Sequence, residues 1–522
     1  MVARLVIGSI LVATAIGAVV TFAAAPAGDD AAPDLLAFEA PTPTPVVPPT
    51  PTPAPTPTPT PPPTPTPTPV PYDGWVDPAS SGDPWGETVE GLLTFRGSPT
   101  RSYYGAGPVP LSPEIVWSFP DGLMCSNSTV GSETTNWCGT GWTGQPAVWE
   151  QDGRTLLSFG GYDRAVHLLD ADTGERQLAD FVTGDLIKGS VTVDPDGYPL
   201  IYTGSRDNFL RALAFDRPEK FEELWRLDAR SIEPRRWNDD WDGAPLVIDD
   251  YLFEGGENSN IHIVKLNRAY DENGLVTVDP ELVFAAPGWD DELTAAVGGN
   301  VSIENSVAIS GNTLWFANSG GLVQGWDITG LADGAVPERT FRWWAGDDID
   351  ASIVIDDDGM LYVAVEYERR LARSAEVGQL VKLDPTRPDD PIVWSIDDRG
   401  TVPAGFWATP AIHDDVVVAS TDGGRLIGVD RETGEIRWEK QLPGPLWGSQ
   451  VIVDAVLLQG DCSGVLHAYD LSDTTIDPPE LWSVAIGGCI ESTPAVWDGA
   501  IYVGTRSGRL HALADPAGEP TT

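Results

Sequence analysis

Short runs of apolar residues, separated by turns rich in Gly and Asp, recur along most of the chain. The stretch TDGGRLIGVDRETGEIRW at 421–438 shows the pattern: a turn, a β-branched run, a second turn, and a run that closes near a tryptophan. Short apolar runs bounded by such turn residues are typical of β-strands. The pattern therefore predicts an all-β fold.

The same pattern occurs eight times. Each copy has a short apolar strand, an Asp/Gly turn, a β-branched strand, a Gly-rich turn and a third strand that ends near Asp. Four antiparallel strands in each repeat make a propeller blade, and the spacing of about 50 residues is typical of propeller repeats. The copies begin at Gln145, Ser190, Ala244, Ser306, Ser352, Thr409, Ser449 and Thr493.

A fourth strand that contains Trp follows five of the copies, at 223–228, 339–344, 391–397, 435–441 and 480–486. The last copy stops at Ala512 with three strands, whereas EIVWSF at 114–119 precedes the first complete copy and has no partner. Pairing these two segments removes two exposed sheet edges. We therefore predict an eight-bladed β-propeller over residues 114–514, closed by an N-terminal strand, with residues 73–113 as an arm lying on it.

The chain before the arm has two other compositions. Residues 1–27 contain one Arg and an apolar run from Leu5 to Ala25, which predicts an apolar helix, either a cleaved signal peptide or a membrane anchor of barely sufficient length. Both alternatives place the rest of the chain outside the cytoplasm, secreted or anchored to the cytoplasmic membrane. Residues 28–72 form a Pro/Thr-rich linker, either a disordered tail or an extended stalk. Residues 515–522 are expected to be a disordered tail.

The charge limits the partners. The chain has 78 acidic and 31 basic residues, a net charge of −47. A field of this sign repels nucleic acid and anionic lipid head groups, so we expect no nucleic acid partner and membrane contact only through the N-terminal helix. Divalent cations and basic ligands remain compatible, although the acidity is also explained as a means of staying soluble.

Four cysteines in an exported chain indicate two disulfides. Cys125 and Cys138 both lie between the closing strand and the first complete copy. Cys462 lies in the turn between the second and third strands of the seventh copy, and Cys489 lies in the loop to the eighth. These two connections emerge on the same face of an up-and-down blade, so we predict the pairs Cys125–Cys138 and Cys462–Cys489.

The stretch GVDRETGEIRW at 428–438 resembles the tryptophan-docking repeat of pyrroloquinoline quinone (PQQ) propellers, Ala-x-Asp-x-x-Thr-Gly-Lys-x-x-Trp. Four residues match this repeat: Asp430, Thr433, Gly434 and Trp438. Gly428 and Glu435 depart from it. A second stretch matches at Asp170, Thr173 and Gly174, with Leu178 in place of the Trp. The resemblance implies that the Trp packs between blades and that Thr-Gly makes a turn. Such repeats build quinoprotein alcohol dehydrogenases and also cofactor-free scaffolds such as the outer-membrane assembly propeller, so the resemblance implies architecture and not activity.

The loops that lead into the inner strands of a propeller converge on the mouth of the central channel. Aligning the eight copies predicts a funnel ring of one residue from each loop: Thr143, Lys188, Asp242, Glu304, Asp350, Trp407, Trp447 and Glu491. The same loops carry further acidic residues: Asp239, Asp240, Asp290, Asp291, Asp347 and Asp348.

The funnel ring combines two chemistries. Asp242, Glu304 and Asp350 come from consecutive blades and offer the oxygen ligands that Ca²⁺ prefers. Trp407 and Trp447 offer a flat face for a ring or a sugar. The alternative is that an acidic protein places carboxylates in any exposed loop and that the tryptophans only pack.

Two classes of function fit these observations. We favour a stalk-mounted, non-catalytic module that needs no cofactor and binds a protein, a glycan or a small molecule through the funnel face. The alternative is a PQQ- and Ca²⁺-dependent dehydrogenase of alcohols or sugars, with Asp350 as the base and Glu304 and Lys188 in supporting roles. The adjacent-cysteine disulfide that the resemblance to such enzymes would imply is missing from this chain.

Overall fold

The computed structural model describes residues 72–516 except 87, 131, 143 and 401–403. The chain divides into two units, residues 1–69 and 70–522. The predicted N-terminal helix (1–27), nearly all of the Pro/Thr-rich linker (28–72) and most of the expected tail (515–522) lie outside the described residues. In the described part, no helix is both long and apolar enough to cross a lipid bilayer.

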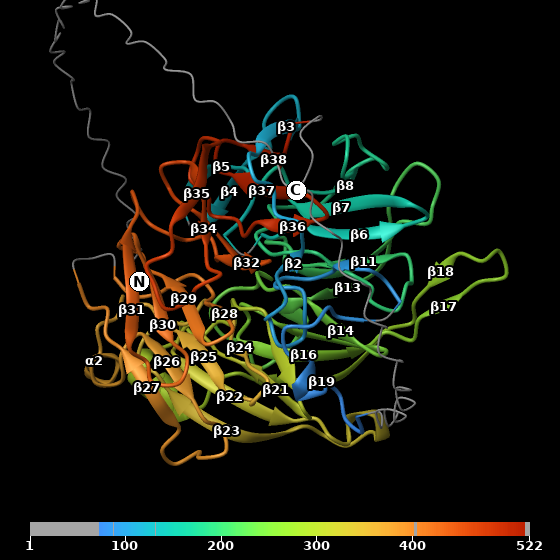
Figure 1. Ribbon diagram of the computed structural model, residues 1–522. Helices are drawn as coiled ribbons and strands as arrows, with labels where there is room; N and C mark the ends of the chain where they lie inside the picture. The colour runs from blue at the N-terminus through green and yellow to red at the C-terminus, as the bar shows by residue number, and fades with distance from the viewer. Residues whose placement is uncertain (1–71, 87, 131, 143, 401–403, 517–522) are drawn as a thin grey trace, which may run out of the picture. The chain divides into compact units, whose positions relative to one another are not determined.

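Eight β-sheets surround a central channel and form the eight predicted blades (Figure 1). From the inside outward, blades 1 to 4 are β6 (Ala147–Gln151), β7 (Arg154–Gly160), β8 (Ala165–Asp170) and β9 (Phe181–Val182); β10 (Thr192–Val193), β11 (Leu200–Thr203), β12 (Phe209–Ala214) and β13 (Glu222–Asp228); β14 (Leu246–Ile248), β15 (Tyr251–Gly255), β16 (Asn260–Lys265) and β19 (Glu281–Pro287); and β20 (Ala308–Ser310), β21 (Thr313–Phe316), β22 (Leu322–Asp327) and β23 (Glu338–Trp344).

The remaining blades follow the same order. Blades 5 to 8 are β24 (Val354–Ile355), β25 (Leu361–Ala364), β26 (Leu380–Leu383) and β27 (Ile392–Ile396); β28 (Ala411–His413), β29 (Val416–Ser420), β30 (Arg425–Asp430) and β31 (Ile436–Gln441); β32 (Val451–Val453), β33 (Val456–Gly460), β34 (Val465–Asp470) and β35 (Glu480–Ala485); and β36 (Ala495–Trp497), β37 (Ala500–Thr505), β38 (Arg509–Ala514) and β3 (Glu114–Phe119).

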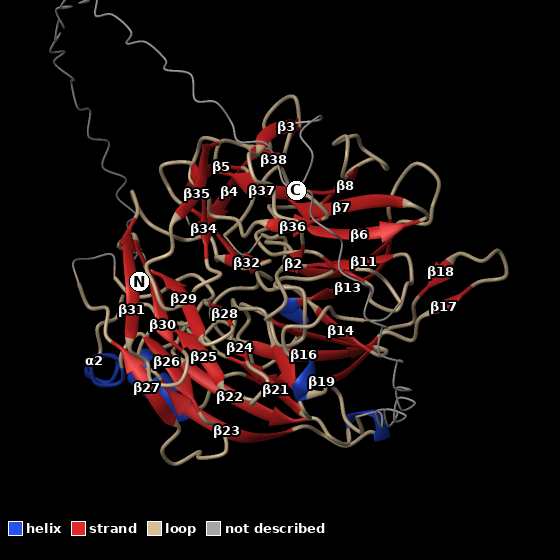
Figure 2. Ribbon diagram, viewed as in Figure 1, coloured by secondary structure: helices blue, strands red, loops and turns tan. Residues whose placement is uncertain are grey.

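Few elements lie outside the blades (Figure 2). The arm contributes β1 to the inner edge of blade 1 and β2 to that of blade 8. These short elements are β1 (Gly91–Leu92), β2 (Gly105–Ala106), the hairpins β4 (Cys125–Val130) with β5 (Glu133–Cys138) and β17 (Ala269–Tyr270) with β18 (Val276–Thr277), the helices α1 (Asp291–Val297) and α2 (Ala372–Val377), and the 3₁₀ turns η1 (Pro78–Ser80), η2 (Ala229–Ser231) and η3 (Leu331–Asp333).

The ring closes as predicted. The strand β3 pairs antiparallel with β38, with Glu114 opposite Ala514 and Phe119 opposite Leu510. The inner strands β6 and β36 also contact each other across this closure. The N-terminal strand therefore completes blade 8, and the eight-bladed architecture is confirmed.

Two outer strands depart from the tryptophan pattern. In blade 1 the outer strand β9 has two residues, and in blade 3 the outer strand β19 follows the hairpin β17–β18 and contains no Trp. The sequence pattern did not identify β19, because an inserted hairpin separates it from β16 and it lacks the Trp that marks the others.

The Asp-x-x-Thr-Gly segment is a turn on which a neighbouring tryptophan rests. Asp430 Oδ1 accepts hydrogen bonds from the backbone N and the hydroxyl of Thr433, at 2.7 and 2.9 Å. Gly434 follows at φ 76°, and the Trp394 ring of the preceding blade lies over it. The Trp394 indole donates to the Arg431 carbonyl at 3.1 Å. This segment therefore joins blade 5 to blade 6.

The ring closure repeats the same contact. Trp117 of β3 donates its indole N–H to the Ala171 carbonyl at 2.9 Å, and its ring lies over Gly174. Apolar clusters fill the spaces between blades; one of them joins Tyr362 and Leu380 of blade 5 to Val417 of blade 6. Because both faces of most strands are covered in this way, the strands are apolar on both sides.

The N-terminal arm enters the central channel. Residues 94–102 are all buried, including the polar side chains of Arg96 and Arg101, which are 0% exposed. Arm carbonyls accept hydrogen bonds from the backbone N–H groups of Val193, Ile309 and Ile355 on three inner strands, at 2.8–3.0 Å. The arm thus pairs with strand edges that would otherwise face an open channel.

Both buried arginines bond to carbonyl oxygens at the ends of the lead-in segments. Arg101 donates from Nε to the Val307 carbonyl at 2.8 Å and from Nη2 to the Ala244 carbonyl at 3.2 Å. Arg96 donates to the carbonyls of Pro410 and Gln450 on the other side of the channel. Burial lowers the pKa of Arg101 to about 9. These bonds offset the cost of burying two guanidinium groups.

Candidate functional site

Two sets of loops emerge on one face of the ring, which we call the funnel face. Lead-in loops join the outer strand of one blade to the inner strand of the next, and second-turn loops join the second and third strands of a blade. All predicted funnel-ring residues in the described chain lie on lead-in loops; Thr143 lies outside the described residues.

Most of these lead-in residues meet the second-turn loop of their own blade. Glu304 accepts from the Ser319 hydroxyl at 3.1 Å, and Glu491 lies 3.0 Å from Arg506 Nη1. In each pair, the sequence alignment identified the residue on the lead-in loop and not the residue on the second-turn loop. Glu257, Ser319, Glu366, Asp422 and Arg506 were missed, although each follows the end of its second strand by one to three residues, and this offset is a signal in the sequence.

Lys188 lies between the carboxylates of blade 3. Its ammonium group contacts Asp242, and its Nζ lies 3.0 Å from Glu257 Oε1. Arg206 Nε lies 2.7 Å from Asp240 Oδ2 in the same group. Burial would lower the pKa of Lys188, but the carboxylates of Asp242 and Glu257 outweigh burial and hold that pKa well above its ordinary value.

Asp240 lies in the same group and is itself buried. Burial, together with the neighbouring Glu257 carboxylate, raises the pKa of Asp240 to about 7. Carboxylate oxygens of Asp240, Asp242 and Glu257 lie within 4.8 Å of one another, but two protein cations already contact this group. This arc is therefore an internal ion-pair network.

A second carboxylate group lies in blade 5. One carboxylate oxygen each from Asp348, Asp350 and Glu366 lie within 4.8 Å of one another. Glu366 is 5% exposed, and its Oε1 has no hydrogen-bond partner among the described residues. Burial and the nearby carboxylates of Asp348 and Glu368 raise the pKa of Glu366 well above its ordinary value. The Arg369 guanidinium lies near this group, with Nη2 3.5 Å from Asp348 Oδ2.

The structure regroups the three predicted metal ligands. Asp242 belongs with Lys188, and Asp350 belongs with Asp348 and Glu366. Glu304 lies between the two groups, since Ser319 Oγ is within hydrogen-bond distance of both Glu304 Oε1, at 3.1 Å, and Asp350 Oδ1, at 3.4 Å. The regrouping moves the candidate cation site to Asp348, Asp350 and Glu366.

The two ring tryptophans form one aromatic block. The Trp407 and Trp447 rings meet edge to face, with centroids 5.1 Å apart, and Trp142 extends the block with its centroid 5.6 Å from Trp407. The Trp447 indole donates to the Asp422 carboxylate. Burial raises the pKa of Asp422 to about 6, and Glu368 adds to the effect.

The block lies beside the blade 5 carboxylates. Phe406, which precedes Trp407, donates its backbone N–H to the Val365 carbonyl at 2.9 Å, and Val365 precedes Glu366. An isolated β-bridge between Glu366 and Gly405 holds the same segments together. The segment that carries Trp407 is therefore bonded along its backbone to the segment that carries Glu366.

Both predicted disulfides are present, and both lie on the funnel face. Cys125–Cys138 joins the strands of the hairpin β4–β5, and Cys462–Cys489 joins the second-turn loop of blade 7 to the lead-in loop of blade 8. The hairpin also brings Trp137 under the Arg506 guanidinium, 4.8 Å from the ring centroid. The Cys462–Cys489 cross-link therefore ties the loop that carries Glu491 to blade 7, and the hairpin β4–β5 contacts Arg506 through Trp137.

The sequence matches no protein-family model and no curated protein. Solved structures are similar to the chain in fold. BamB from Moraxella catarrhalis is 16% identical, over 77% of this chain and 100% of that one, with a TM-score of 0.49. The quinohemoprotein alcohol dehydrogenase from Comamonas testosteroni is 14% identical, over 83% and 82% of the two chains, with a TM-score of 0.52.

A second such enzyme, the quinohemoprotein alcohol dehydrogenase ADHIIG from Pseudomonas putida HK5, is 14% identical, over 85% of this chain and 83% of that one, with a TM-score of 0.52. Identities this low indicate a common fold and leave the activity open. Together with the eight sheets and the tryptophan-on-turn contacts, they show that the chain is an eight-bladed β-propeller built from PQQ-like repeats.

Proposed function

We propose that the chain is an exported, non-catalytic binding module that holds its ligand on the funnel face. The observation that carries the proposal is the position of the Trp407–Trp447 block beside the buried, partly unbonded Glu366 carboxyl. Aromatic faces next to carboxylates are suited to ligands that carry positive charge on an apolar body. Two disulfides favour a location outside the cytoplasm.

The charge of the funnel face argues against an anionic ligand. Acidic side chains outnumber the basic ones here, and Lys188 and Arg206 already contact carboxylates. PQQ itself carries carboxylate groups, and bringing them into this field would cost electrostatic energy. A cationic protein segment or small molecule fits the field better.

The dehydrogenase alternative has one observation in its favour. Asp348, Asp350 and Glu366 offer three closely spaced carboxylate oxygens, the donor type that Ca²⁺ prefers. A bound divalent cation would supply a Lewis acid next to the aromatic block. Lys188, the cation expected beside a quinone, contacts Asp242 and Glu257 instead, so the chain's own residues fit the metal better than the quinone.

The two functions are separated by one set of measurements on the full chain. It is incubated with PQQ and Ca²⁺, desalted, and assayed for retained quinone absorbance and for dye reduction with alcohols and sugars. The binding module predicts no retained quinone and no turnover. Retained quinone together with turnover that Asp350→Asn abolishes would establish the dehydrogenase instead.

Calcium alone tests the cation site. If the blade 5 carboxylates bind it, Ca²⁺ raises the melting temperature, because a ligand bound only by the folded state stabilises that state. Glu366→Gln with Asp348→Asn should abolish this rise. The matched pair Asp240→Asn with Glu257→Gln changes the same charge in the Lys188 network and should leave the rise in place. No rise in the parent chain would reject the site.

A further inference from the structure

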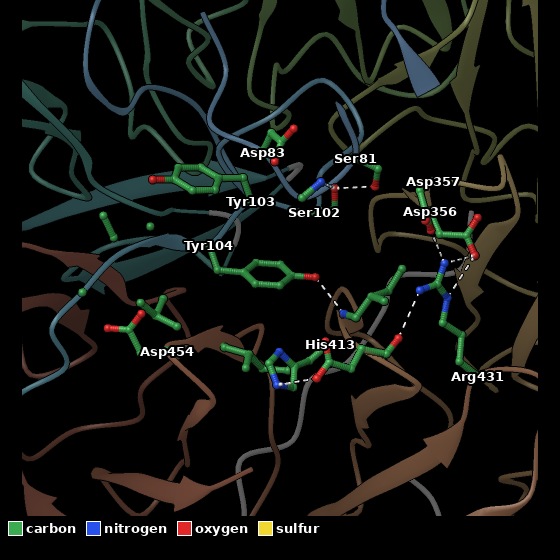
Figure 3. Close-up of a pocket in the computed structure, with 18 residues that line it drawn as sticks. Ser81, Asp83, Ser102, Tyr103, Tyr104, Asp356, Asp357, His413, Arg431 and Asp454 are labelled. Carbon is green, nitrogen blue, oxygen red and sulfur yellow. Dashed lines mark hydrogen bonds and ion pairs between the residues drawn. The ribbon is translucent and has the colours of Figure 1, made fainter. Parts of the chain in front are cut away.

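A cavity of about 600 Å³ lies between the arm and the turns of blades 5, 6 and 7 (Figure 3). The hairpins that join first and second strands emerge opposite the funnel face, and three of them form one wall. Arm residues 81–83 and 102–107 form the other wall. We call this cavity the arm pocket; its volume is that of a small-molecule site.

The arm pocket exists because the arm does not follow the inner edge of blade 7. Arm backbone atoms bond to the inner strands of blades 2, 4 and 5, and β2 pairs with β36 of blade 8. Within the described residues, no backbone hydrogen bond joins the arm to β32. Ile452 and Val453 of β32 therefore line a space that neither the arm nor blade 7 fills.

The lining carries a large excess of negative charge. Its acidic and basic residues are five aspartates, one arginine and one histidine: Asp83, Asp356, Asp357, Asp414, Asp454, Arg431 and His413. The single arginine is committed to one end, where its guanidinium contacts Asp356 and Asp357. His413 Nε2 lies 3.7 Å from Asp414 Oδ2. In the part of the chain that the structure describes, no Lys or Arg forms an ion pair with Asp83 or Asp454.

These carboxylates surround a space and do not meet at a point. In the described chain, no three of them come within metal-ligand distance of one another. Figure 3 shows Asp83 on one side of the Tyr104 ring and Asp454 on the other. Ala106, Ile452 and the Tyr104 ring add apolar groups to the lining. A single metal ion would not reach both ends of this arrangement.

We propose that the arm pocket binds a small linear polyamine, an aliphatic chain with two or more protonated amines. One ammonium group lies at Asp83 and another at Asp454, where charge-assisted hydrogen bonds form. The methylene groups between them cover Ile452 and Ala106, as the stem of a buried lysine would. The Tyr104 ring lines the same space, with the Arg96 guanidinium over one of its faces at 4.4 Å from the centroid. This site is separate from the funnel face, and its occupancy does not depend on the function proposed there.

Isothermal titration of the full chain with spermidine at 150 mM salt tests the proposal. We expect one saturable site, with affinity weakened about three- to tenfold by Asp454→Asn or Asp83→Asn and further by both. Asp454 lies at φ 50°, a conformation that Asn adopts readily, so the turn is preserved. The matched control is Asp152→Asn in the corresponding turn of blade 1, at φ 53° and outside the pocket, which should change the affinity less than twofold.

Three further titrations define the class of ligand. The neutral chain 1,8-octanediol should not bind, and Ca²⁺ at the same concentration should not displace spermidine. A lysine tetrapeptide should bind more weakly than spermidine. Equal weakening by Asp152→Asn, or displacement by Ca²⁺, would show diffuse attraction to an acidic protein and overturn the proposal. Tighter binding of the tetrapeptide, or no saturable site in the parent chain, would overturn it as well.

Discussion

Phe119 of β3 lies opposite Leu510 of β38, so residues from the two ends of the propeller share one ladder. Removing residues 1–71 should leave the melting temperature unchanged, because that segment precedes the arm. Removing residues 1–119 should lower the melting temperature far more, because it exposes the outer edge of β38 and empties the channel. Circular dichroism melts check this, and removal of residues 1–111 separates the loss of the arm from the loss of β3. Equal melting of the first two truncations would contradict closure by β3.

The glycine of the tryptophan-docking turn should be costly to replace. Gly434→Ala places a Cβ at φ 76° and 2.6 Å from Trp394 Cγ. Gly359 has the same φ of 76° and nothing within 4 Å of the added Cβ, so it is a matched control. Gly359→Ala should cost about 1–2 kcal/mol for the left-handed backbone alone, and Gly434→Ala should cost about 1–3 kcal/mol more, because the indole must move. Chemical denaturation measures the difference, and equal costs would show that the ring contact contributes nothing.

Arg101 should tolerate no substitution by lysine. Its guanidinium donates to the carbonyls of Phe95, Ala244 and Val307, and one ammonium group cannot reach all of them. Arg101→Lys should destabilise the protein by about 3 kcal/mol or more, since buried carbonyls lose their donors. The exposed Arg387→Lys, which keeps an ion pair to Asp384, should cost less than about 0.5 kcal/mol. Similar urea midpoints for the two variants would argue against the channel position of the arm.

The raised pKa of the Asp422 carboxyl group should make the folded protein less stable as the pH rises. The folded protein holds its proton up to about pH 6, whereas the unfolded chain releases it near pH 4. The folded state therefore binds more protons between these values, and stability falls as the pH rises through this window. Asp422→Asn keeps an acceptor for Trp447 and should raise stability at pH 7 by about 1 kcal/mol after allowance for solvent screening.

Asp430 is a control for the same reasoning, because its pKa is shifted in the opposite direction. Hydrogen bonds from the Thr433 backbone and from Arg437 hold the pKa of Asp430 at about 2, so its contribution is present above pH 4 and is lost as the pH falls through 2. Asp430→Asn should therefore destabilise the protein at pH 7. Melting temperatures from pH 4 to pH 8 check both variants, and shifts of the same sign would show that the assigned causes are wrong.

The disulfide Cys462–Cys489 should contribute more stability than Cys125–Cys138. The first closes a loop with a sequence separation of 27 and the second one of 13. Loop-closure entropy predicts about 3 kcal/mol for each pair, with the longer loop the larger. Melting of the two double Cys→Ser variants measures the order, and peptide mapping without reductant checks the pairing in solution.

The blades were predictable because each repeats a local pattern that can be aligned against seven others. Asp430, Thr433 and Gly434 identify a turn on their own, and the unpaired segment 114–119 had one chemically sensible partner. The disulfide pairs followed from the strand order. The outer strand β19 was missed because it carries no tryptophan, and no local rule replaces that mark.

The arm and the carboxylate grouping were not predictable from such alignments. LTFRGSPTRS contains two arginines and reads as a surface segment, and the carbonyls that receive them come from lead-in segments far apart in the sequence. The alignment of lead-in loops identified Asp350 and Glu491 but gave no information on what lies beside them. Glu366 and Arg506 come from second-turn loops, and only the pairing of β-strands brings the two loop sets together.

The buried arm separates the two faces of the ring. Residues 94–102 are all buried, and their arginines bond to opposite sides of the channel wall. The arm segment therefore lies in the channel between the funnel face and the arm pocket. One ring of blades then presents two binding surfaces, the funnel face and the arm pocket, on opposite sides of one buried segment.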